Sequence, residues 1–552
     1  MKNRKKWLSY ALAGVVVLSS LTVMQSNPQV EASKQAKKSP TNVIMLVMDG
    51  SSNNTVSLAR WYKGENLAMD GILTGAVTTY SAESAITDSA PAGTALATGH
   101  KSNSGFVGVL PSKVDMPGVK ENPVNAFTPV ANVLEGAKQL GKATGIVATS
   151  EIQHATPASF SSHVTSRSNY DDIGEQQVYQ NLDVILGGGY DYLKASNRKD
   201  GEDLIRVIED KGYDLVTTRD GLLSSKSNKI YGSFASSSLA YDLDRPITKT
   251  DEPTLAEMTS KAIKTLSKDK DGFFLMVEGS KVDWAAHAND PIGMITEILA
   301  FDDAVTEALK FAKKDKNTMV IAVTDHGNSG ITIGNENTTS TYNKINMSNY
   351  IDPLKKATMT VEGALSQLKP DRSNLVEVAK LYGLEHLTAE EKAALNATAT
   401  TKLSSTFVKL LSKRADLGFT TGGHTGDDVF LYSYGPQRIS GLVDNTDLAK
   451  EMASFMGIKL DKLTNDLYVN AEVALKAKGY TTSIDLSDKE NAVLVVKKGT
   501  ATFEIPENKN IIIHKTINKK GNVTLNKIQT NTISVYNGTS FFISKATINN
   551  LK

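Results

Sequence analysis

The sequence predicts an α/β fold in which a largely parallel sheet carries the functional site. Three short apolar runs lead to this prediction: residues 42–48, 273–277 and 318–324. Runs of this length and composition are typical of strands that are buried on both faces of a sheet. Each run is followed by an acidic residue, in order Asp49, Glu278 and Asp325. Because parallel α/β sheets bind ligands beyond the carboxyl ends of their strands, we expect these acids to lie together.

Histidines near these acids extend the pattern. Asp283 and His287 follow Glu278, His326 follows Asp325, and His424 stands in a Gly-His-Thr-Gly segment. A single Asp or His of this kind is more often a helix cap or a loop residue, but packing does not explain the whole set. Mixed Asp and His ligands suit zinc, whereas sets of oxygen ligands alone suit magnesium. The sequence therefore predicts a metal site at this edge of the sheet.

Residues 88–98, with the sequence DSAPAGTALAT, predict a helix that begins at a serine. A helix N-terminus offers backbone N–H donors and a partial positive charge, so it suits an anion or an anionic nucleophile at Ser89. The alternative is a helix of small residues with Asp88 as an ordinary N-cap. The acids and histidines elsewhere in the chain favour Ser89 as a nucleophile.

With these segments in place, residues 41–457 resemble the alkaline phosphatase family. The shared motifs are the Ser89 segment, Asp49-Gly50, Thr156-Pro157, His163-Val164-Thr165-Ser166-Arg167, Glu278-Gly279 with Asp283 and His287, Asp325-His326-Gly327, His424-Thr425-Gly426 and Tyr434-Gly435-Pro436. The resemblance implies a three-layer sandwich with a central, largely parallel sheet. It also implies hydrolysis of small phosphate monoesters by a metalloenzyme of the bacterial, Bacillus type, and a homodimer is common in the family.

The resemblance implies two Zn²⁺ ions and one Mg²⁺ ion per subunit. The first zinc site would comprise Asp283, His287 and His424. The second would comprise Asp49, Asp325, His326 and Ser89. Magnesium would share Asp49 and be completed by Thr156 and Glu278.

The resemblance also implies a mechanism through a phosphoserine intermediate. Ser89 would attack phosphorus, and Arg167 would hold two phosphate oxygens with its planar fork, a geometry that lysine cannot reproduce. Asp88 would orient this arginine. His163 is expected to support the arginine rather than to bind metal.

Two positions next to the site depart from the best-known bacterial pattern. His154 stands where that pattern has an Asp, and Trp284 stands where it has a Lys. A histidine beside the magnesium position puts the occupancy of that site in question. The loss of a lysine should weaken the binding of product phosphate. Drift within a subgroup is the alternative explanation for both residues.

The sequence fits three alternative functions less well than it fits phosphate monoester hydrolysis. A sulfatase shares the fold, but its Cys/Ser-x-Pro-x-Arg pattern is broken here because Gly93 stands in the arginine position. Phosphodiesterases of the superfamily usually have a threonine nucleophile. A surface-attached binding protein would lack some of the ligands, and none is missing.

The length of 552 residues exceeds one average domain and predicts a second, smaller one. Residues 41–460 form the expected catalytic domain, and residues 465–552 form an accessory domain rich in β-branched runs. An Asn537-Gly538 pair inside residues 533–541 predicts a β-hairpin. Attachment to the cell wall and a passive role in stability are both open for this domain.

A stretch without predicted metal ligands, residues 327–423, is expected to contain a helical insertion. Helical periodicity covers residues 365–381 and 388–411, and Thr388 with Glu391 predicts a capping box. Such an insertion would shape the entrance to the site or contribute to a subunit interface.

The N-terminus predicts export. Residues 1–32 contain a basic start, an apolar stretch and a Val-Glu-Ala cleavage site, as in a signal peptide, and residues 33–40 form a spacer. An uncleaved membrane anchor is the alternative. Cleavage removes four basic residues and one acidic residue, which moves the formal charge from +1 to −2 and disfavours nucleic acid as the main partner. The absence of cysteine suits a secreted or cell-surface protein of a Gram-positive bacterium.

Overall fold

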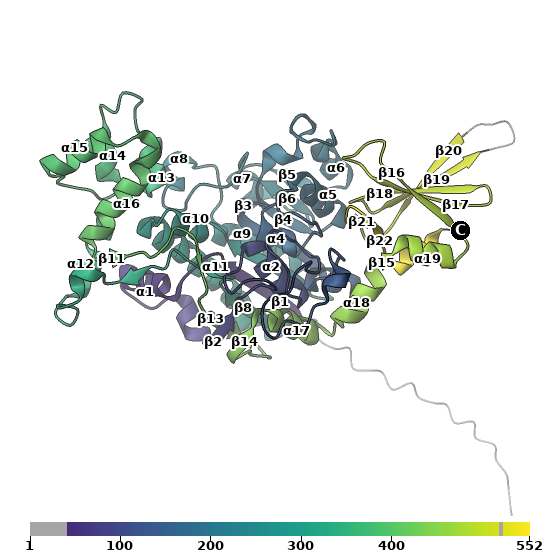
Figure 1. Cartoon of the computed structure of the whole chain (residues 1–552), viewed down its shortest axis with the longest axis horizontal. Coiled ribbons are helices and arrows are strands. Elements are labelled where there is room, and N and C mark those ends of the chain that lie inside the picture. Colours follow the sequence, from purple (N-terminus) through teal and green to yellow (C-terminus); the bar gives the residue numbers. More distant parts are fainter. Residues whose placement is uncertain (1–40, 518–522, 552) are drawn as a thin grey trace, which may run out of the picture. The chain divides into compact units, whose positions relative to one another are not determined.

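The computed structural model describes residues 41–517 and 523–551, and these described residues belong to one compact unit (Figure 1). Within the described residues, ten strands form a central sheet in the order β14-β2-β13-β8-β1-β7-β3-β4-β6-β5. Neighbouring strands are parallel except at β13, which is antiparallel to β2 and β8. The strands are β1 (Asn42–Met48), β2 (Leu73–Thr78), β3 (Ala143–Glu151), β4 (Val184–Gly188), β5 (Asp214–Val216), β6 (Ile230–Ser233), β7 (Phe273–Gly279), β8 (Thr318–Val323), β13 (Val429–Tyr434) and β14 (Gly441–Asp444). The predicted α/β fold with a largely parallel sheet is confirmed.

The three apolar runs of the sequence are the central strands β8, β1 and β7. Val47 of β1 is in register with Glu278 of β7 and with Val323 of β8. The acids that end these strands therefore reach the same edge of the sheet. The backbone N–H of Gly50 donates to Asp325 at 3.1 Å, which ties the ends of β1 and β8 together.

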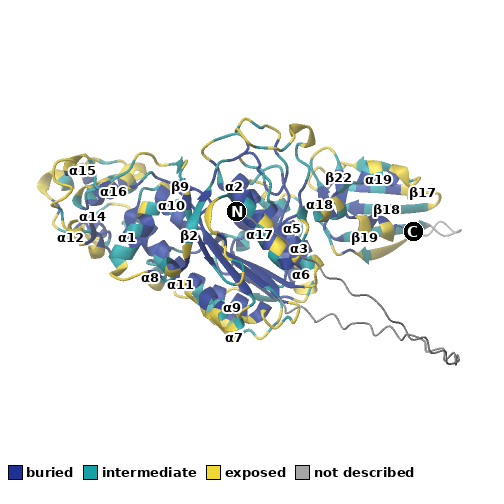
Figure 2. Ribbon diagram, turned by 90° about the horizontal axis from the view of Figure 1, so that it is seen from below, coloured by how far each residue is buried: buried dark blue, intermediate teal, exposed yellow. Residues whose placement is uncertain are grey.

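Alternate side chains of β1 enter two different hydrophobic cores. Ile44 and Leu46 pack on one face of the sheet, and Met45 and Val47 pack on the other. Helices α9 (Leu255–Leu266) and α11 (Pro291–Asp315) contribute to the first core, and α3 (Val133–Gln139) and α17 (Asn445–Met456) contribute to the second. This arrangement is a three-layer sandwich, and the sheet is buried between its helices (Figure 2).

Residues 327–423, the helical insertion, contain five short α-helices. These are α12 (Met347–Ile351), α13 (Val361–Ser366), α14 (Leu375–Leu381), α15 (Ala389–Ala397) and α16 (Leu403–Arg414). Each of the two ranges with helical periodicity, 365–381 and 388–411, is divided between two separate helices. Pro370 and the left-handed Arg372 (φ 57°) interrupt the first segment, and an extended Thr398 interrupts the second. The capping box is confirmed, since Thr388 and Glu391 exchange hydrogen bonds of 3.1 and 2.9 Å.

Residues 465–551, the C-terminal module, combine two small antiparallel sheets with two short helices. Strands β16 (Thr481–Asp485), β17 (Val493–Lys498), β18 (Ala501–Pro506), β19 (Ile511–Ile517) and β20 (Val523–Gln529) form a meander. Strands β15 (Val469–Asn470), β21 (Val535–Tyr536) and β22 (Phe541–Ile543) form the second sheet. Helices α19 (Ala471–Ala477) and α20 (Lys545–Asn550) pack with these strands around a core of their own. The expected hairpin is present, since β21 pairs with β22 across Asn537-Gly538.

The signal peptide (1–32) and the spacer (33–40) lie outside the described residues. Among the residues that are described, no helix has the length and hydrophobicity that crossing a membrane requires.

Candidate active site

The serine that the sequence singled out is the first residue of helix α2 (Ser89–Thr98) and is 2% exposed. Its Oγ lies 3.0 Å from Nε2 of His326, which arrives from the end of β8. Asp88 occupies the N-cap position, but its side chain makes no capping hydrogen bond. It accepts hydrogen bonds from Arg167 and from the N–H of Gly105 instead. Asp88 therefore pairs with Arg167 instead of capping α2, and the N–H groups at the start of α2 remain available to an anion.

Asp283, His287 and His424 form one cluster whose ligand atoms lie within 4.8 Å of one another. Helix α10 (Lys281–His287) brings the first two residues, and β12 (His424–Thr425) brings the third. Each histidine donates from Nδ1 to a backbone carbonyl: His287 to Gly422 at 2.9 Å, and His424 to Thr87 at 2.7 Å. The two Nε2 atoms lie 3.2 Å apart. Such fixed tautomers leave both Nε2 atoms available to one cation.

The two histidines of this cluster have pKa values that are shifted in opposite directions. The adjacent Asp283 raises the pKa of His287 to about 9, because it favours the imidazolium form. Burial lowers the pKa of His424, and the neighbouring His326 lowers it further. Gly50 permits the close approach of Asp283, because it has φ 67° and a Cβ there would lie 2.3 Å from Oδ1 of Asp283.

Asp49 belongs to two further clusters of the same size. One contains Asp325 and His326, and the other contains His154 and Glu278; all five side chains are buried. Within the described residues, neither carboxylate oxygen of Asp49 accepts a hydrogen bond, and Oε1 of Glu278 accepts none either. Burial, together with the nearby Asp325, raises the pKa of Glu278 to about 7 and that of Asp49 well above its usual range. Buried carboxylate oxygens that accept no hydrogen bond are the environment that a divalent cation stabilises.

Thr156 and Arg167 complete the set of predicted site residues near His154 in the sequence. Thr156 is fully buried on helix α4 (Ala155–Ser159), and its hydroxyl has no hydrogen-bond partner among the described residues. Arg167 donates to Nε2 of His154 at 2.9 Å and forms an ion pair with Asp88. Burial lowers the pKa of His154 to about 3, and the charge of Arg167 acts in the same direction. His154 is therefore neutral.

The structure adds to the interpretation of His154 and Trp284. The sequence analysis expected His154 beside the magnesium position, and its ligand atom lies within 4.8 Å of those of Asp49 and Glu278. Trp284 packs edge-on against His154, with 5.9 Å between ring centroids. Nζ of Lys281, one helical turn earlier, lies 5.0 Å from the centroid of the Trp284 ring. No residue spacing in the sequence predicted that the ammonium group of Lys281 would lie close to the Trp284 ring.

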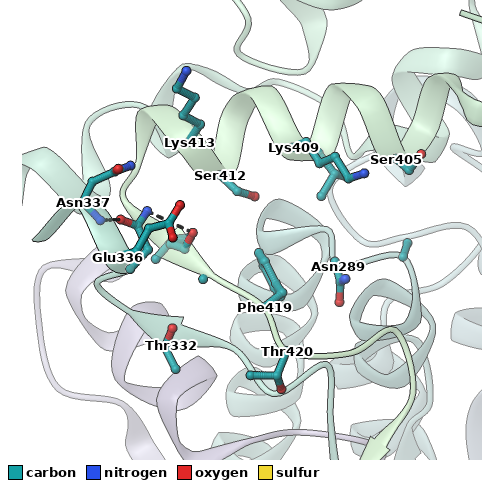
Figure 3. A pocket seen from close by; sticks show the side chains of 15 residues that line it. Asn289, Thr332, Glu336, Asn337, Ser405, Lys409, Ser412, Lys413, Phe419 and Thr420 are labelled. Carbon is teal, nitrogen blue, oxygen red and sulfur yellow. Dashed lines mark hydrogen bonds between the residues drawn. The ribbon is translucent and has the colours of Figure 1, made fainter. Parts of the chain in front are cut away.

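A pocket of about 750 Å³ lies between helix α16 and the segments that carry His287 and His424 (Figure 3). Ala288 and Asn289 follow His287, and Phe419 and Thr420 lead to His424. The Ser412 hydroxyl points from α16 into the space above Phe419 (Figure 3). The helical insertion thus shapes the surface next to the Asp283 cluster.

The fold and the clustered side chains define a metal-dependent hydrolase of the α/β class, with a buried serine beside His326, an arginine paired with Asp88, and three potential cation sites around them. A family model described as alkaline phosphatase matches residues 40–458. Alkaline phosphatase 3 of Bacillus subtilis is 37% identical over 494 residues, which cover 84% of this chain and 99% of that protein. Alkaline phosphatase 4 of the same organism is 38% identical, with 77% and 91% covered.

Solved structures agree with these relatives. The alkaline phosphatase of Thermus thermophilus superposes with a TM-score of 0.68 at 27% identity, covering 77% of this chain and 92% of that one. The enzyme of the Antarctic bacterium TAB5 gives a TM-score of 0.56 at 27% identity, with 76% and 99% covered. The chain belongs to the alkaline phosphatase family. It is a metalloenzyme that hydrolyses phosphate monoesters, and residues beyond 458 lie outside the family match.

Proposed function

We propose that hydrolysis proceeds through a phosphoserine on Ser89, with Arg167 holding the phosphoryl group. The observation that carries this proposal is the convergence of Ser89, Arg167 and the three acid clusters at one edge of the sheet. Ser89 attacks phosphorus in line and the alcohol leaves. Water then attacks the phosphoserine from the opposite side and releases phosphate, which frees Ser89 for the next cycle.

The donor sets fit the expected cations. Asp283, His287 and His424 would hold one Zn²⁺, and Asp49, Asp325 and His326 with Ser89 would hold the second. Mg²⁺ would be held by Asp49, Thr156 and Glu278. The carboxylate oxygens without hydrogen bonds and the fixed histidine tautomers support this assignment. Bound cations would favour the alkoxide of Ser89, lower the pKa of water and offset charge on the leaving oxygen.

The chain's own groups bind and orient the phosphoryl group. Asp88 keeps the guanidinium of Arg167 charged, since it raises the arginine pKa although burial alone would lower it. Neutral His154 accepts from the same guanidinium and so fixes its plane. The remaining N–H groups of Arg167 can then bind two phosphate oxygens.

His154 makes the third cation position the most distinctive one. A mutant of the TAB5 enzyme in which a histidine is replaced by aspartate holds Mg in its M3 site. We infer that His154→Asp would raise the affinity of this site for Mg²⁺, because it adds an oxygen ligand to the Asp49 and Glu278 pair.

The cellular setting follows from the sequence. We propose a secreted or cell-surface enzyme of a Gram-positive bacterium, acting on small phosphate monoesters as a homodimer. Attachment to the cell wall through the C-terminal module is a further part of this proposal.

The direct test compares Ser89→Ala with the wild type, both stripped of metal and reloaded with Zn²⁺ and Mg²⁺. An aryl phosphate monoester, its diester and its sulfate serve as substrates. We expect metal-dependent cleavage of the monoester by the wild type and loss of at least about a thousandfold in kcat for the variant. Trapping with ³²P-labelled substrate should label Ser89. Wild-type turnover by Ser89→Ala, or a preference for the diester, would contradict the proposal.

A further inference from the structure

Two residues beyond the family match, Tyr468 and Asn508, hold the segment that presents Arg167: Tyr468 contacts His163 directly, and Asn508 contacts helix α5, whose Gln176 binds the backbone of His163. Tyr468 follows helix α18 (Leu460–Leu467), and Asn508 lies in the turn between β18 and β19. Both are buried, at 6% and 3% exposed. We propose that these two residues are positioning residues for phosphate binding, because they fix residues 163–167 from two directions. The proposal rests on the assigned role of Arg167.

The first contact holds the ring of His163. The Tyr468 hydroxyl donates to the Glu135 carboxylate and lies 2.7 Å from Nε2 of His163. The other ring nitrogen, Nδ1, donates to the carbonyl of Gly108 at 2.8 Å. The aromatic rings of Tyr468 and His163 also pack together, with 4.6 Å between centroids. Each edge of the imidazole therefore has a partner, and one of these partners comes from outside the family domain.

The second contact holds the backbone of the same residue. Gln176 of helix α5 (Tyr170–Gln180) accepts from the N–H of His163 at 2.7 Å and donates to its carbonyl at 3.1 Å. The same Nε2 group donates to Oδ1 of Asn508 at 2.9 Å. Nδ2 of Asn508 donates to Asp172 at 3.1 Å and to Glu175 at 3.0 Å, both on α5. The side-chain amide of Asn508 therefore makes hydrogen bonds with three side chains of helix α5.

The neighbouring lysine strengthens this attachment. Nζ of Lys509 lies 2.8 Å from Glu175 and 3.1 Å from Glu202. Burial raises the pKa of Glu175 well above its usual range, and the charge of Lys509 opposes that shift. Asn508 has φ 61°, a backbone conformation that asparagine tolerates better than most residues. The turn is therefore shaped to place these two side chains on α5.

Arg167 is only four residues from His163 and three residues before α5 begins. Between these points, Val164 pairs with Val107 and the N–H of Arg167 donates to Gly105 at 2.7 Å. Because the segment is short and both of its ends are held, a shift of His163 or α5 changes where the guanidinium lies. Loss of Tyr468 or Asn508 contacts should therefore weaken phosphate binding more than it slows the bond-breaking step.

The experiment measures inhibition by inorganic phosphate in the full-length, metal-loaded enzyme, for Tyr468→Phe and Asn508→Gly. Glycine accepts the left-handed backbone of residue 508, so Asn508→Gly removes the side-chain contacts and keeps the turn. We expect the inhibition constant and KM to rise roughly three- to tenfold in each variant, with a smaller change in kcat. Tyr480→Phe is the matched control, because it removes a hydroxyl that donates to Leu551 inside the C-terminal module. It should keep the wild-type constants.

An Arg167→Ala background separates positioning from general stability. There, Tyr468→Phe should cause no further rise in the inhibition constant, since the group that it positions is absent. Unchanged constants in both single variants, or an equal rise in the Arg167→Ala background, overturn the proposal. If Arg167→Ala alone leaves phosphate inhibition unchanged, the assigned role of Arg167 fails and this proposal fails with it. Melting temperatures identify a variant that is merely unfolded, and Tyr468→Phe, the milder change, then decides the outcome.

Discussion

The helical insertion and the C-terminal module support opposite sides of the site in different ways. The insertion is attached next to the histidines: Asp290, three residues after His287, accepts from the N–H of Val361 at 3.0 Å and from the Tyr382 hydroxyl at 2.7 Å. The C-terminal module instead reaches the Arg167 side through His163 and helix α5. One region contacts the residues that follow the Asp283 cluster, and the other contacts His163 and α5 on either side of Arg167, the proposed phosphate-binding residue. Damage to the two regions should therefore have separable effects on metal retention and on phosphate affinity.

The largest expected effect comes from residues inside the site. His424→Ala removes one of two imidazoles whose Nε2 atoms are 3.2 Å apart, so metal should be lost and kcat should fall at least about a thousandfold. Arg167→Ala should keep the metal content and raise the phosphate inhibition constant roughly ten- to hundredfold. Elemental analysis and inhibition kinetics on both variants check this contrast. Equal metal loss in the two variants would contradict the expected difference between them.

Metal removal should destabilise the protein in a pH-dependent way. The folded, metal-free protein has a Glu278 pKa of about 7, above its unfolded value, so Glu278 binds a proton more tightly in the folded state. Its contribution to stability is therefore present at low pH and is lost as the pH rises through about 7. The melting temperature of the chelated enzyme should fall between pH 5 and pH 8 relative to the reloaded enzyme. A difference that shrinks with rising pH would contradict this prediction.

A moderate effect should follow from loosening the insertion. Tyr382→Phe removes a donor from the buried Asp290 carboxylate, and we expect a loss of about 1–3 kcal/mol in unfolding free energy. Zinc should also dissociate faster, because Asp290 follows directly on the helix that ends at His287. Phosphate inhibition of the fully loaded variant should match that of the wild type. Denaturant unfolding, chelator-competition kinetics and inhibition assays separate these outcomes.

The smallest effect concerns the residue after Asp283. Trp284→Lys introduces a cation next to His154 and should tighten phosphate binding by a few-fold, with slower product release. Trp284→Phe is the control, because it keeps an aromatic ring without adding charge. Identical inhibition constants in both variants would show that the tryptophan does not tune product binding.

The sequence predicted the central sheet more accurately than the helical insertion and the contacts of the C-terminal module. Residues 42–48, 273–277 and 318–324 are adjacent parallel strands, as their apolar composition and terminal acids indicated. The acids and histidines chosen from these strand ends do meet in space. Register and strand order fix that edge, so short-range patterns were sufficient there.

Long-range contacts could not be predicted in the same way. The split of residues 365–381 depends on Pro370 and the turn after it, and periodicity alone passed over both. The packing of Trp284 on His154 depends on how α10 lies against the start of α4, which no spacing in the sequence expresses. The contacts of Tyr468 and Asn508 join residues about 300 positions apart in the chain.

The wide spread of the site along the chain also determines when activity can first appear during synthesis. The acid clusters draw on residues from Asp49 to His424, Tyr468 contacts His163, and Asn508 contacts Gln176, which in turn binds His163. A ribosome must therefore translate past codon 424 before any chain can complete the Asp283 cluster, and past codon 508 before the arginine segment is fully held. Truncated products from early termination would be inactive towards phosphate esters, because they lack residues that the site needs.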